Sequence, residues 1–162
     1  MIDIHPNAKI SKWTDIEDSV RGSRIVIGAF SSLDSFVKIK PAGGIGDLII
    51  GERTVINSCC VLYTGNGIQI GNDVAIASNC SFAPVNHAYH EKNRRISEQG
   101  FLPSKGGIVI EDDVWIGVNC VILDGAILRQ GCVVGAGSVV RTELPAYSIN
   151  VGNPLRQVGW RK

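Results

Sequence analysis

An aliphatic side chain returns at every sixth position between residues 110 and 140 of this chain. A small or modest side chain follows each of these positions four residues later. The aliphatic positions are Ile110, Ile116, Ile122, Leu128, Val134 and Val140. A helix or a coiled coil would show a period of 3.6 or 3.5 residues instead. A six-residue period indicates a parallel β-helix, in which each hexapeptide supplies one short strand and one turn.

Three hexapeptides complete one triangular coil, so residues eighteen positions apart are expected to lie one above the other. Stacked strands are about 4.8 Å apart. The aliphatic side chain of each hexapeptide points inward, and one coil cannot bury its own apolar surface, so several coils must stack. The sequence therefore predicts an all-β fold, a parallel β-helix of hexapeptide repeats.

The regularity of the repeat changes along the chain. It is clean over residues 50–144 and blurred over residues 1–49, which we expect to form irregular first coils with a capping role. Pro145 cannot donate a ladder hydrogen bond, so residues 145–162 are expected to form a C-terminal tail. No linker separates these parts, and the sequence therefore predicts one domain over residues 1–162.

Two segments interrupt the repeat. The run from Pro41 to Asp47 is rich in turn residues and is predicted to loop out. A longer polar and charged segment interrupts the six-residue repeat from about residue 87 to residue 107. A loop of this length in a compact domain is usually functional or disordered. Because the repeat continues on both sides, we expect one long loop that protrudes from a corner of the helix.

Composition and charge exclude several classes of function. The hydrophobic content is 44% and the net charge is +1, as in ordinary soluble domains. Neutral charge and few aromatic residues argue against a nucleic-acid-binding module. No apolar run is long enough to span a bilayer. The first residues lack the basic and apolar regions of a signal peptide, so we expect a cytoplasmic location.

The five cysteines are interpreted as small buried residues. Four of them, Cys60, Cys80, Cys120 and Cys132, fall on the small inward position of the repeat, and Cys59 does not. An odd number of cysteines and a cytoplasmic location disfavour a disulfide framework. No C-x-x-C pair occurs, and no metal site is expected.

Three motifs together resemble the hexapeptide-repeat acyltransferases. They run from Ile110 to Gly117, from Val134 to Val140 and from Val151 to Leu155. The resemblance implies a left-handed β-helix, whereas the general rule for crossovers predicts a right-handed one. It also implies a homotrimer with active sites between neighbouring subunits, and acetyl-CoA lying along the groove between two helices.

The residues of the long loop resemble those of particular members of this family. Asn86 and His87 at its start are similar to the catalytic segment of maltose, galactoside and streptogramin acetyltransferases. The end of the loop, from Glu98 to Phe101, and the repeat that contains Trp115 look most like O-antigen and capsule O-acetyltransferases. The implied reaction is transfer of an acetyl group from acetyl-CoA to a hydroxyl of a sugar, as in polysaccharide biosynthesis.

Transfer to a hydroxyl needs a base, and histidine titrates near the working pH. The candidates are His5, His87 and His90. We choose His87 as the catalytic base because the repeat breaks there and, above all, because of the family match. Asn86 is a candidate for acceptor binding or for fixing the loop, and is also a common turn residue. Glu98 is a candidate for meeting a sugar hydroxyl or orienting the imidazole, or is a solvated loop carboxylate.

The resemblance also assigns candidate contacts for acetyl-CoA. Trp115 is one of them, with a packing residue on the groove wall as the alternative. Glycines and a small residue allow close approach of the pantetheine arm, or serve only tight turns; they are Gly117, Gly135, Ala136 and Gly137. Arginine suits phosphate, which makes Arg141 and Arg156 candidates, although each is also an ordinary surface charge. The oxyanion is expected to meet an amide in a turn near Ala77 or Trp115.

Other functions stay open at this stage. N-acetylation of a nucleotide-linked amino sugar needs the same base, and an antibiotic is another possible acceptor. A basic cluster in the loop, Lys92, Arg94 and Arg95, is a candidate for holding an anionic acceptor or is simply solvated. A zinc hydratase on this fold needs three converging histidines, and His5 is far from the other two along the chain. A trimeric scaffold without catalysis also fits the fold, because fold alone does not establish activity.

Overall fold

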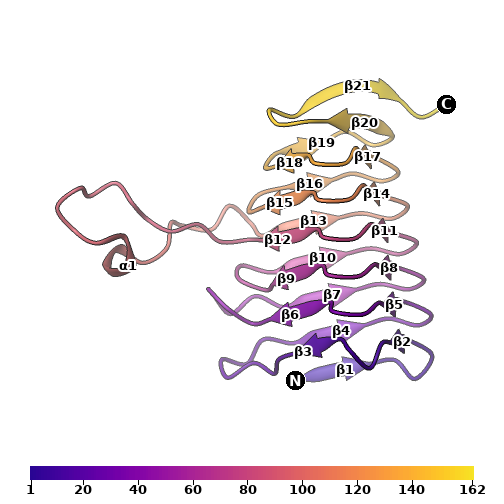
Figure 1. Ribbon diagram of the computed structural model, residues 1–162, viewed down its shortest axis with the longest axis horizontal. Coiled ribbons are helices and arrows are strands. Elements are labelled where there is room, and N and C mark those ends of the chain that lie inside the picture. The colour runs from indigo at the N-terminus through magenta and orange to yellow at the C-terminus, as the bar shows by residue number, and fades with distance from the viewer.

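The computed structural model describes all 162 residues and shows a stack of coils with a strand on each of three faces (Figure 1). Sheet A contains β1 (Ile2–Ile4), β4 (Ile25–Ile27), β7 (Leu48–Ile50), β10 (Ile68–Ile70), β13 (Ile108–Ile110), β16 (Ile127–Leu128) and β19 (Glu143–Leu144). Sheet B contains β2 (Lys9–Ile10), β5 (Ser32–Leu33), β8 (Val55–Ile56), β11 (Ala75–Ile76), β14 (Trp115–Ile116), β17 (Val133–Val134), β20 (Ser148–Val151) and β21 (Arg156–Trp160). Sheet C contains β3 (Asp15–Ile16), β6 (Lys38–Lys40), β9 (Val61–Tyr63), β12 (Ser81–Ala83), β15 (Val121–Leu123) and β18 (Val139–Val140).

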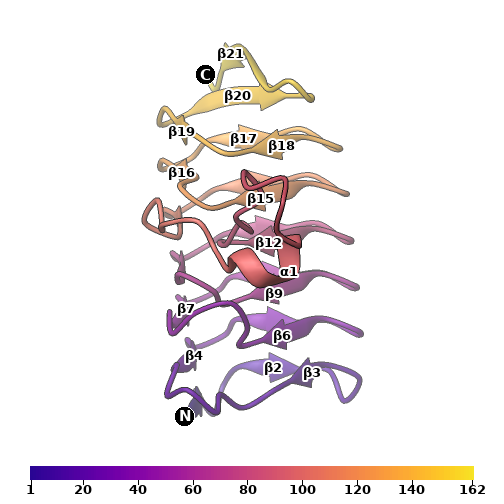
Figure 2. The ribbon, with the colours of Figure 1, turned by 90° about the vertical axis from the view of Figure 1, so that its left-hand side faces the viewer.

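The chain visits sheets A, B and C in turn, and we name the turns between them the A–B, B–C and C–A corners. All strand pairs are parallel except β20 with β21. This is the left-handed parallel β-helix that the resemblance implied. The only helix, α1 (Ile96–Gln99), lies in the loop between β12 and β13, which projects from the stack (Figures 1 and 2). No helix is long and apolar enough to cross a bilayer.

The repeat predicts the coil geometry where it is clean. Ile110 pairs with Leu128, eighteen positions later, as expected. Coils before the loop are longer, because Ile50 pairs with Ile70 and Ile27 pairs with Ile50. Within every coil the inward residues remain six positions apart across the A–B and B–C corners. The additional residues therefore all lie at the C–A corner.

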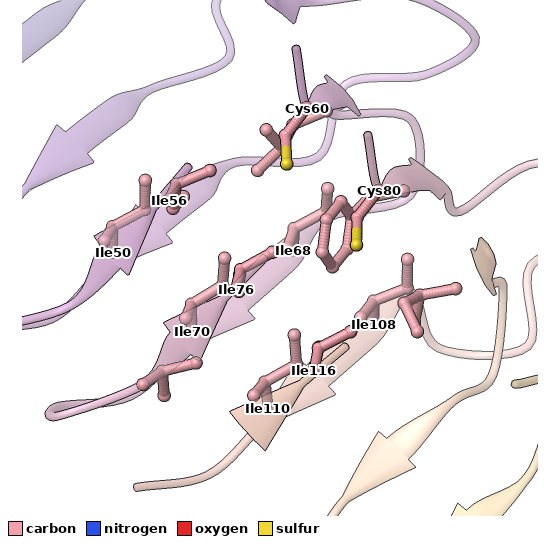
Figure 3. Close-up of a cluster of buried hydrophobic side chains, with 14 of the residues drawn as sticks. Ile50, Ile56, Cys60, Ile68, Ile70, Ile76, Cys80, Ile108, Ile110 and Ile116 are labelled. Atoms are coloured by element: carbon pink, nitrogen blue, oxygen red, sulfur yellow. The ribbon is translucent and has the colours of Figure 1, made fainter. Parts of the chain in front are cut away.

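The inward side chains form one continuous core (Figure 3). Ile76, Ile116 and Val134 stack in register and are completely buried, and Phe82 is the largest buried side chain. Burying an isoleucine contributes about 1.5–3 kcal/mol. Because each coil adds the same three columns, the stack is held together mainly by this repeated apolar contact.

The predicted role of the cysteines is confirmed for the four inward ones. All five thiols are free; Cys59 is exposed and the others are buried. The sulfur atoms of Cys60, Cys80 and Cys120 each donate to a backbone carbonyl of the B–C corner one coil later, at 3.2 Å. Ser138 continues this column, and its hydroxyl donates to the carbonyl of Gly135 at 2.6 Å. The column satisfies polar backbone groups that the core would otherwise leave unpaired.

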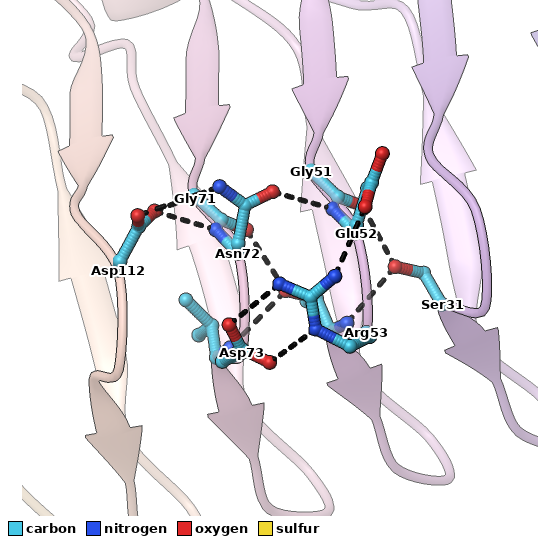
Figure 4. Close-up of polar contacts among 10 residues, drawn as sticks. Ser31, Gly51, Glu52, Arg53, Gly71, Asn72, Asp73 and Asp112 are labelled. Carbon is cyan, nitrogen blue, oxygen red and sulfur yellow. Dashed lines mark hydrogen bonds and ion pairs between the residues drawn. The ribbon is translucent and has the colours of Figure 1, made fainter.

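Polar side chains tie the coils together at the A–B corner (Figure 4). The backbone N–H of Glu52 donates to Oδ1 of Asn72 at 2.8 Å, and the N–H of Asn72 donates to Oδ1 of Asp112 at 2.7 Å. Asn72 and Asp112 lie on either side of the long loop in sequence. The two coils therefore stay in register although the chain leaves the stack between them.

The run from Pro41 to Asp47 contains no strand and loops out at the C–A corner between β6 and β7, as predicted, with Gly43 against the side chain of Val85 at the base of the long loop. The C-terminal segment differs from the predicted tail. The sheet continues beyond Leu144, since β20 pairs with β17. Pro145 lies in the turn before β20, where it need not donate a ladder hydrogen bond. The strand β21 then folds back antiparallel on β20.

Candidate active site at the C–A corner

The long loop leaves the helix on a short antiparallel stem that holds His87. The N–H of Ala88 donates to the carbonyl of Gly100 at 3.0 Å, and the N–H of Leu102 donates to that of Asn86 at 2.8 Å. The imidazole of His87 lies on the ring of Phe101, with 4.7 Å between the centroids. The side chain is exposed. The stem therefore fixes the backbone of His87 while leaving its ring accessible.

A hollow of about 270 Å³ opens beside His87. It is mainly apolar, and its lining includes Tyr63, Val85, His87 and Phe101. Val85 approaches the helix closely because Gly65, in a left-handed conformation (φ 42°), has no side chain; a Cβ there would lie 2.7 Å from Val85. The C–A corners of three successive coils thus form the base on which the loop rests.

A buried carboxylate, Asp124, fastens the other end of the loop. Asp124 is only 3% exposed. Its carboxylate accepts the N–H of Lys105 at 2.8 Å and the N–H of Gly107 at 2.9 Å, and the amide of Asn66 donates to it at 3.4 Å. A buried charge is stable only when such donors surround it. Sequence reasoning missed this residue, because an aspartate before a glycine reads as an ordinary turn.

The other loop candidates lie away from His87. Glu98 is exposed on α1 and forms an ion pair with Arg95 at 3.7 Å rather than contacting the imidazole. Arg94 pairs with Glu91 at 2.8 Å, so two of the three cations in the basic cluster already have a carboxylate partner. His90 stacks on Tyr89, with 4.5 Å between the ring centroids.

Five of the candidate acetyl-CoA contacts lie on another part of the helix. Trp115 is 52% exposed on sheet B, between Ala75 and Val133 in register. Gly117 follows at the B–C corner, where an added Cβ would lie 2.7 Å from the backbone N of Ala136 in the next coil. The structure therefore groups Trp115 and Gly117 with Gly135, Ala136 and Gly137.

The backbone amides of Ala77 and Trp115 themselves are both bonded within the helix. The N–H of Ala77 donates to the carbonyl of Ile116 at 2.9 Å, and that of Trp115 donates to the carbonyl of Cys132 at 3.1 Å. These two bonds join neighbouring coils, so an oxyanion would have to meet another amide of the nearby turns. The N–H groups of Val118, in the turn after Trp115, and of Ala136, in the same turn one coil later, have no backbone partner.

Arg141 and Arg156 lie near the C-terminal end, and neither forms an ion pair in this chain. Arg141 is at the C–A corner, and lines a hollow of about 280 Å³ together with Asn153, Pro154 and Leu155. Arg156 begins β21 and is exposed. Within one chain, His87 therefore lies at the C–A corner and Trp115 lies on sheet B. Sheet C lies between the B–C and C–A corners.

The comparisons with known proteins agree with this architecture. Residues 107–142 match the family model described as bacterial transferase hexapeptide (six repeats). A solved hexapeptide-repeat-containing acetyltransferase of Vibrio cholerae, complexed with acetyl coenzyme A, is 30% identical, has a TM-score of 0.67, and aligns over 84% of this chain and 70% of its own. This chain belongs to the hexapeptide-repeat acyltransferase family.

Two curated relatives are similar to this chain in sequence. A probable acetyltransferase of Mycobacterium tuberculosis is 35% identical over 120 residues, which are 71% of this chain and 39% of that protein. The putative lipopolysaccharide biosynthesis O-acetyl transferase WbbJ of Escherichia coli is 28% identical over 140 residues, which are 83% of this chain and 68% of its own. This hexapeptide-repeat chain therefore spans less than half of the mycobacterial relative's length.

Proposed function

We propose that this protein transfers an acetyl group from acetyl-CoA to a hydroxyl group of a sugar, with His87 as the general base. The observation that carries the proposal is the position of His87, which is the exposed histidine held by a paired stem beside a hollow at the C–A corner. The WbbJ relative, named as an O-acetyl transferase, supports a hydroxyl acceptor.

The reaction needs no covalent enzyme intermediate. The acceptor oxygen attacks the thioester carbonyl carbon while Nε2 or Nδ1 of His87 takes the hydroxyl proton. The tetrahedral intermediate collapses, the carbon–sulfur bond breaks, and the imidazolium returns the proton to the departing thiolate. A free backbone N–H such as that of Ala136 is well suited to stabilise the oxyanion. The buried cysteines are not used, because a nucleophilic thiol must be accessible as a thiolate.

The arrangement supports a site shared between copies of the chain. His87 lies at the C–A corner, whereas Trp115, Gly117 and Ala136 lie on sheet B and at the B–C corner, so acetyl-CoA held by these three residues would be separated from the base of the same copy. A trimer with parallel helix axes would place the C–A corner of one copy beside sheet B of its neighbour. We therefore propose a homotrimer in which Trp115, Gly117 and Ala136 of one copy hold acetyl-CoA beside His87 of the next.

Release of free thiol from acetyl-CoA, measured with a panel of sugars, nucleotide sugars and antibiotics, tests the function. We expect turnover with a sugar acceptor and a product whose acetyl group is removed by mild alkali, because an ester is labile and an amide is not. An alkali-stable product would instead show N-acetylation of an amino sugar. Failure of the protein to bind acetyl-CoA would contradict the proposal and favour a scaffold.

A further inference from the structure

Two exposed aromatic residues at the N-terminal end of the helix have no part in the site above. The side chains of Trp13 and Phe36 are 58% and 61% exposed. Their rings are stacked, with centroids 6.4 Å apart and an interplanar angle of 24°. Both lie at the B–C corner, where the N–H of Phe36 donates to the carbonyl of Trp13 at 3.1 Å. We call this pair the aromatic platform.

The conformation of the turn does not explain why an exposed phenylalanine occupies position 36. Phe36 has a φ of 64°, and the same turn position in later coils holds Cys59, Asn79, Asn119 and Gly137 with φ between 58° and 69°. This left-handed region costs about 1–2 kcal/mol for most residues and least for glycine and asparagine. An exposed phenylalanine recovers none of that energy from the core. Strain of this kind is typically kept where a residue contacts a ligand or partner.

A second exposed phenylalanine lies at the other end of β5. Phe30 precedes β5 and is also exposed, with a φ of 60°. The equivalent A–B turns of later coils have Arg53, Asp73, Asp113, Gly131 and, in the last coil, the aromatic Tyr147 at this position. Phenylalanine in a left-handed turn therefore occurs twice, in one coil, on either side of β5 in sheet B.

A hollow of about 350 Å³ lies on sheet B between these corners. Its lining is mixed, with Ser32, Asp34 and Asn57 beside the exposed Val55. The Ser32 hydroxyl and the Nζ atom of Lys9 form no hydrogen bond within the chain, so both are free to contact a ligand. The hollow therefore offers hydroxyl, amide and charged groups for hydrogen bonds to a polar ligand.

We propose that the aromatic platform and this hollow bind the sugar chain that carries the acceptor hydroxyl. A pyranose ring has an apolar C–H face, which stacks on aromatic rings, and a rim of hydroxyls, which bond to polar side chains. The choice of a sugar as ligand rests on the proposed function, whereas the strained and exposed aromatic residues do not.

The geometry of sheet B connects this surface to the candidate acetyl-CoA site. Ser32 pairs with Val55, Val55 with Ala75, and Ala75 with Trp115, all in register. Three strand spacings separate Ser32 from Trp115, which is about 14 Å at about 4.8 Å per strand. A sugar chain held at the platform can therefore lie along sheet B with its end close to Trp115.

Sugar binding by NMR tests the proposal without acetyl-CoA. The probes are maltopentaose, which is neutral, and a galacturonate pentamer, which is acidic and matches the free Lys9. In the wild type we expect the indole N–H resonance of Trp13, assigned with Trp13→Phe, to shift on titration with at least one probe. Phe36→Asn should weaken that binding about tenfold. Its thermal stability should be equal or higher, because asparagine suits the turn.

Tyr147→Asn is the matched control, because Tyr147 is an exposed aromatic with φ 61° at the other end of the helix. It should bind the probes as the wild type does. Failure of both probes to bind the wild type, or unchanged binding by Phe36→Asn, would overturn the proposal. So would a changed oligomeric state of Phe36→Asn in sedimentation, since the surface would then be an interface between copies. Probe binding without acetyl transfer would overturn only the proposed function.

Discussion

The B–C and C–A corners of this helix follow opposite rules. Across the B–C corner the inward residues are always six positions apart, as from Ile76 to Phe82 and from Ile116 to Ile122. Across the C–A corner the distance from Phe82 to Ile110 is 28 positions, although the strands on both sides remain in register. The comparison shows that this fold tolerates insertions at the C–A corner, and the candidate site lies at that corner.

The length of the B–C corner is fixed because structural contacts or turn residues recur on both its inner and its outer side. Inside, Cys60, Cys80 and Cys120 bond to carbonyls of the next coil, and outside the turn uses a left-handed residue in every coil from Phe36 to Gly137. A change of one residue would exchange the inward and outward side chains of the following strand. The C–A corner has no such repeated contact, and longer loops add only a small entropic cost.

The largest contrast is expected between two histidines of the loop. His87→Ala should lower turnover by about 10²–10⁴-fold, because it removes the general base. His90→Ala should leave turnover within about twofold, since His90 only stacks on Tyr89. Thiol release with the preferred acceptor measures both. A larger loss in His90→Ala would move the base away from the stem.

Asp124→Ala should separate loop position from fold stability. The change leaves the N–H groups of Lys105 and Gly107 without their acceptor, which costs about 1–3 kcal/mol in local stability. We expect faster amide exchange at these two residues and a lower kcat, with a modest change in Tm. Asp124→Asn, which keeps one acceptor oxygen, should be intermediate. An unchanged kcat with a large fall in Tm would show that Asp124 serves only the fold.

Cys60→Ala should have the converse effect at the B–C corner. It removes the hydrogen bond to the carbonyl of Ala77 and a small apolar volume. We expect the free energy of unfolding to fall by about 1–2 kcal/mol. Turnover of the folded protein should be unchanged, because Cys60 lies two coils before β13, where the chain re-enters the stack after the long loop. Cys60→Ser, which has the chemistry of Ser138, should lose less stability, and denaturant unfolding measures the difference.

The smallest effect concerns thiol ionisation. Burial raises the pKa of Cys132 from 9.0 to about 12. A raised folded-state pKa gives stability below pH 9 that is lost as the pH rises from 9 towards 12. Unfolding free energy should therefore fall over this window, and less so in Cys132→Ala. With a thiol reagent at neutral pH, only Cys59 should react in the native protein, and reaction of a second thiol would contradict the burial.

The sequence predicts the core and the position of the loop because both follow from the repeat. Ile116 and Cys120 are identified by spacing alone, and the loss of phase after Phe82 marks the excursion. Asp124 could not be identified, since its role depends on hydrogen bonds from the backbone N–H groups of Lys105 and Gly107, which lie 19 and 17 positions earlier in the chain. Neither could the bonded amide of Trp115, because only the strand register shows that it is unavailable.

Complementation between inactive variants tests most directly whether the site is shared between copies. His87→Ala lacks the base, and Ala136→Glu places a negative charge where we propose that acetyl-CoA binds. Each variant alone should be inactive, and mixed assemblies purified with two different tags should regain turnover, because some sites then combine an intact His87 with an intact Ala136. No recovery in mixed assemblies of two inactive variants, or full activity of Ala136→Glu alone, would contradict the account.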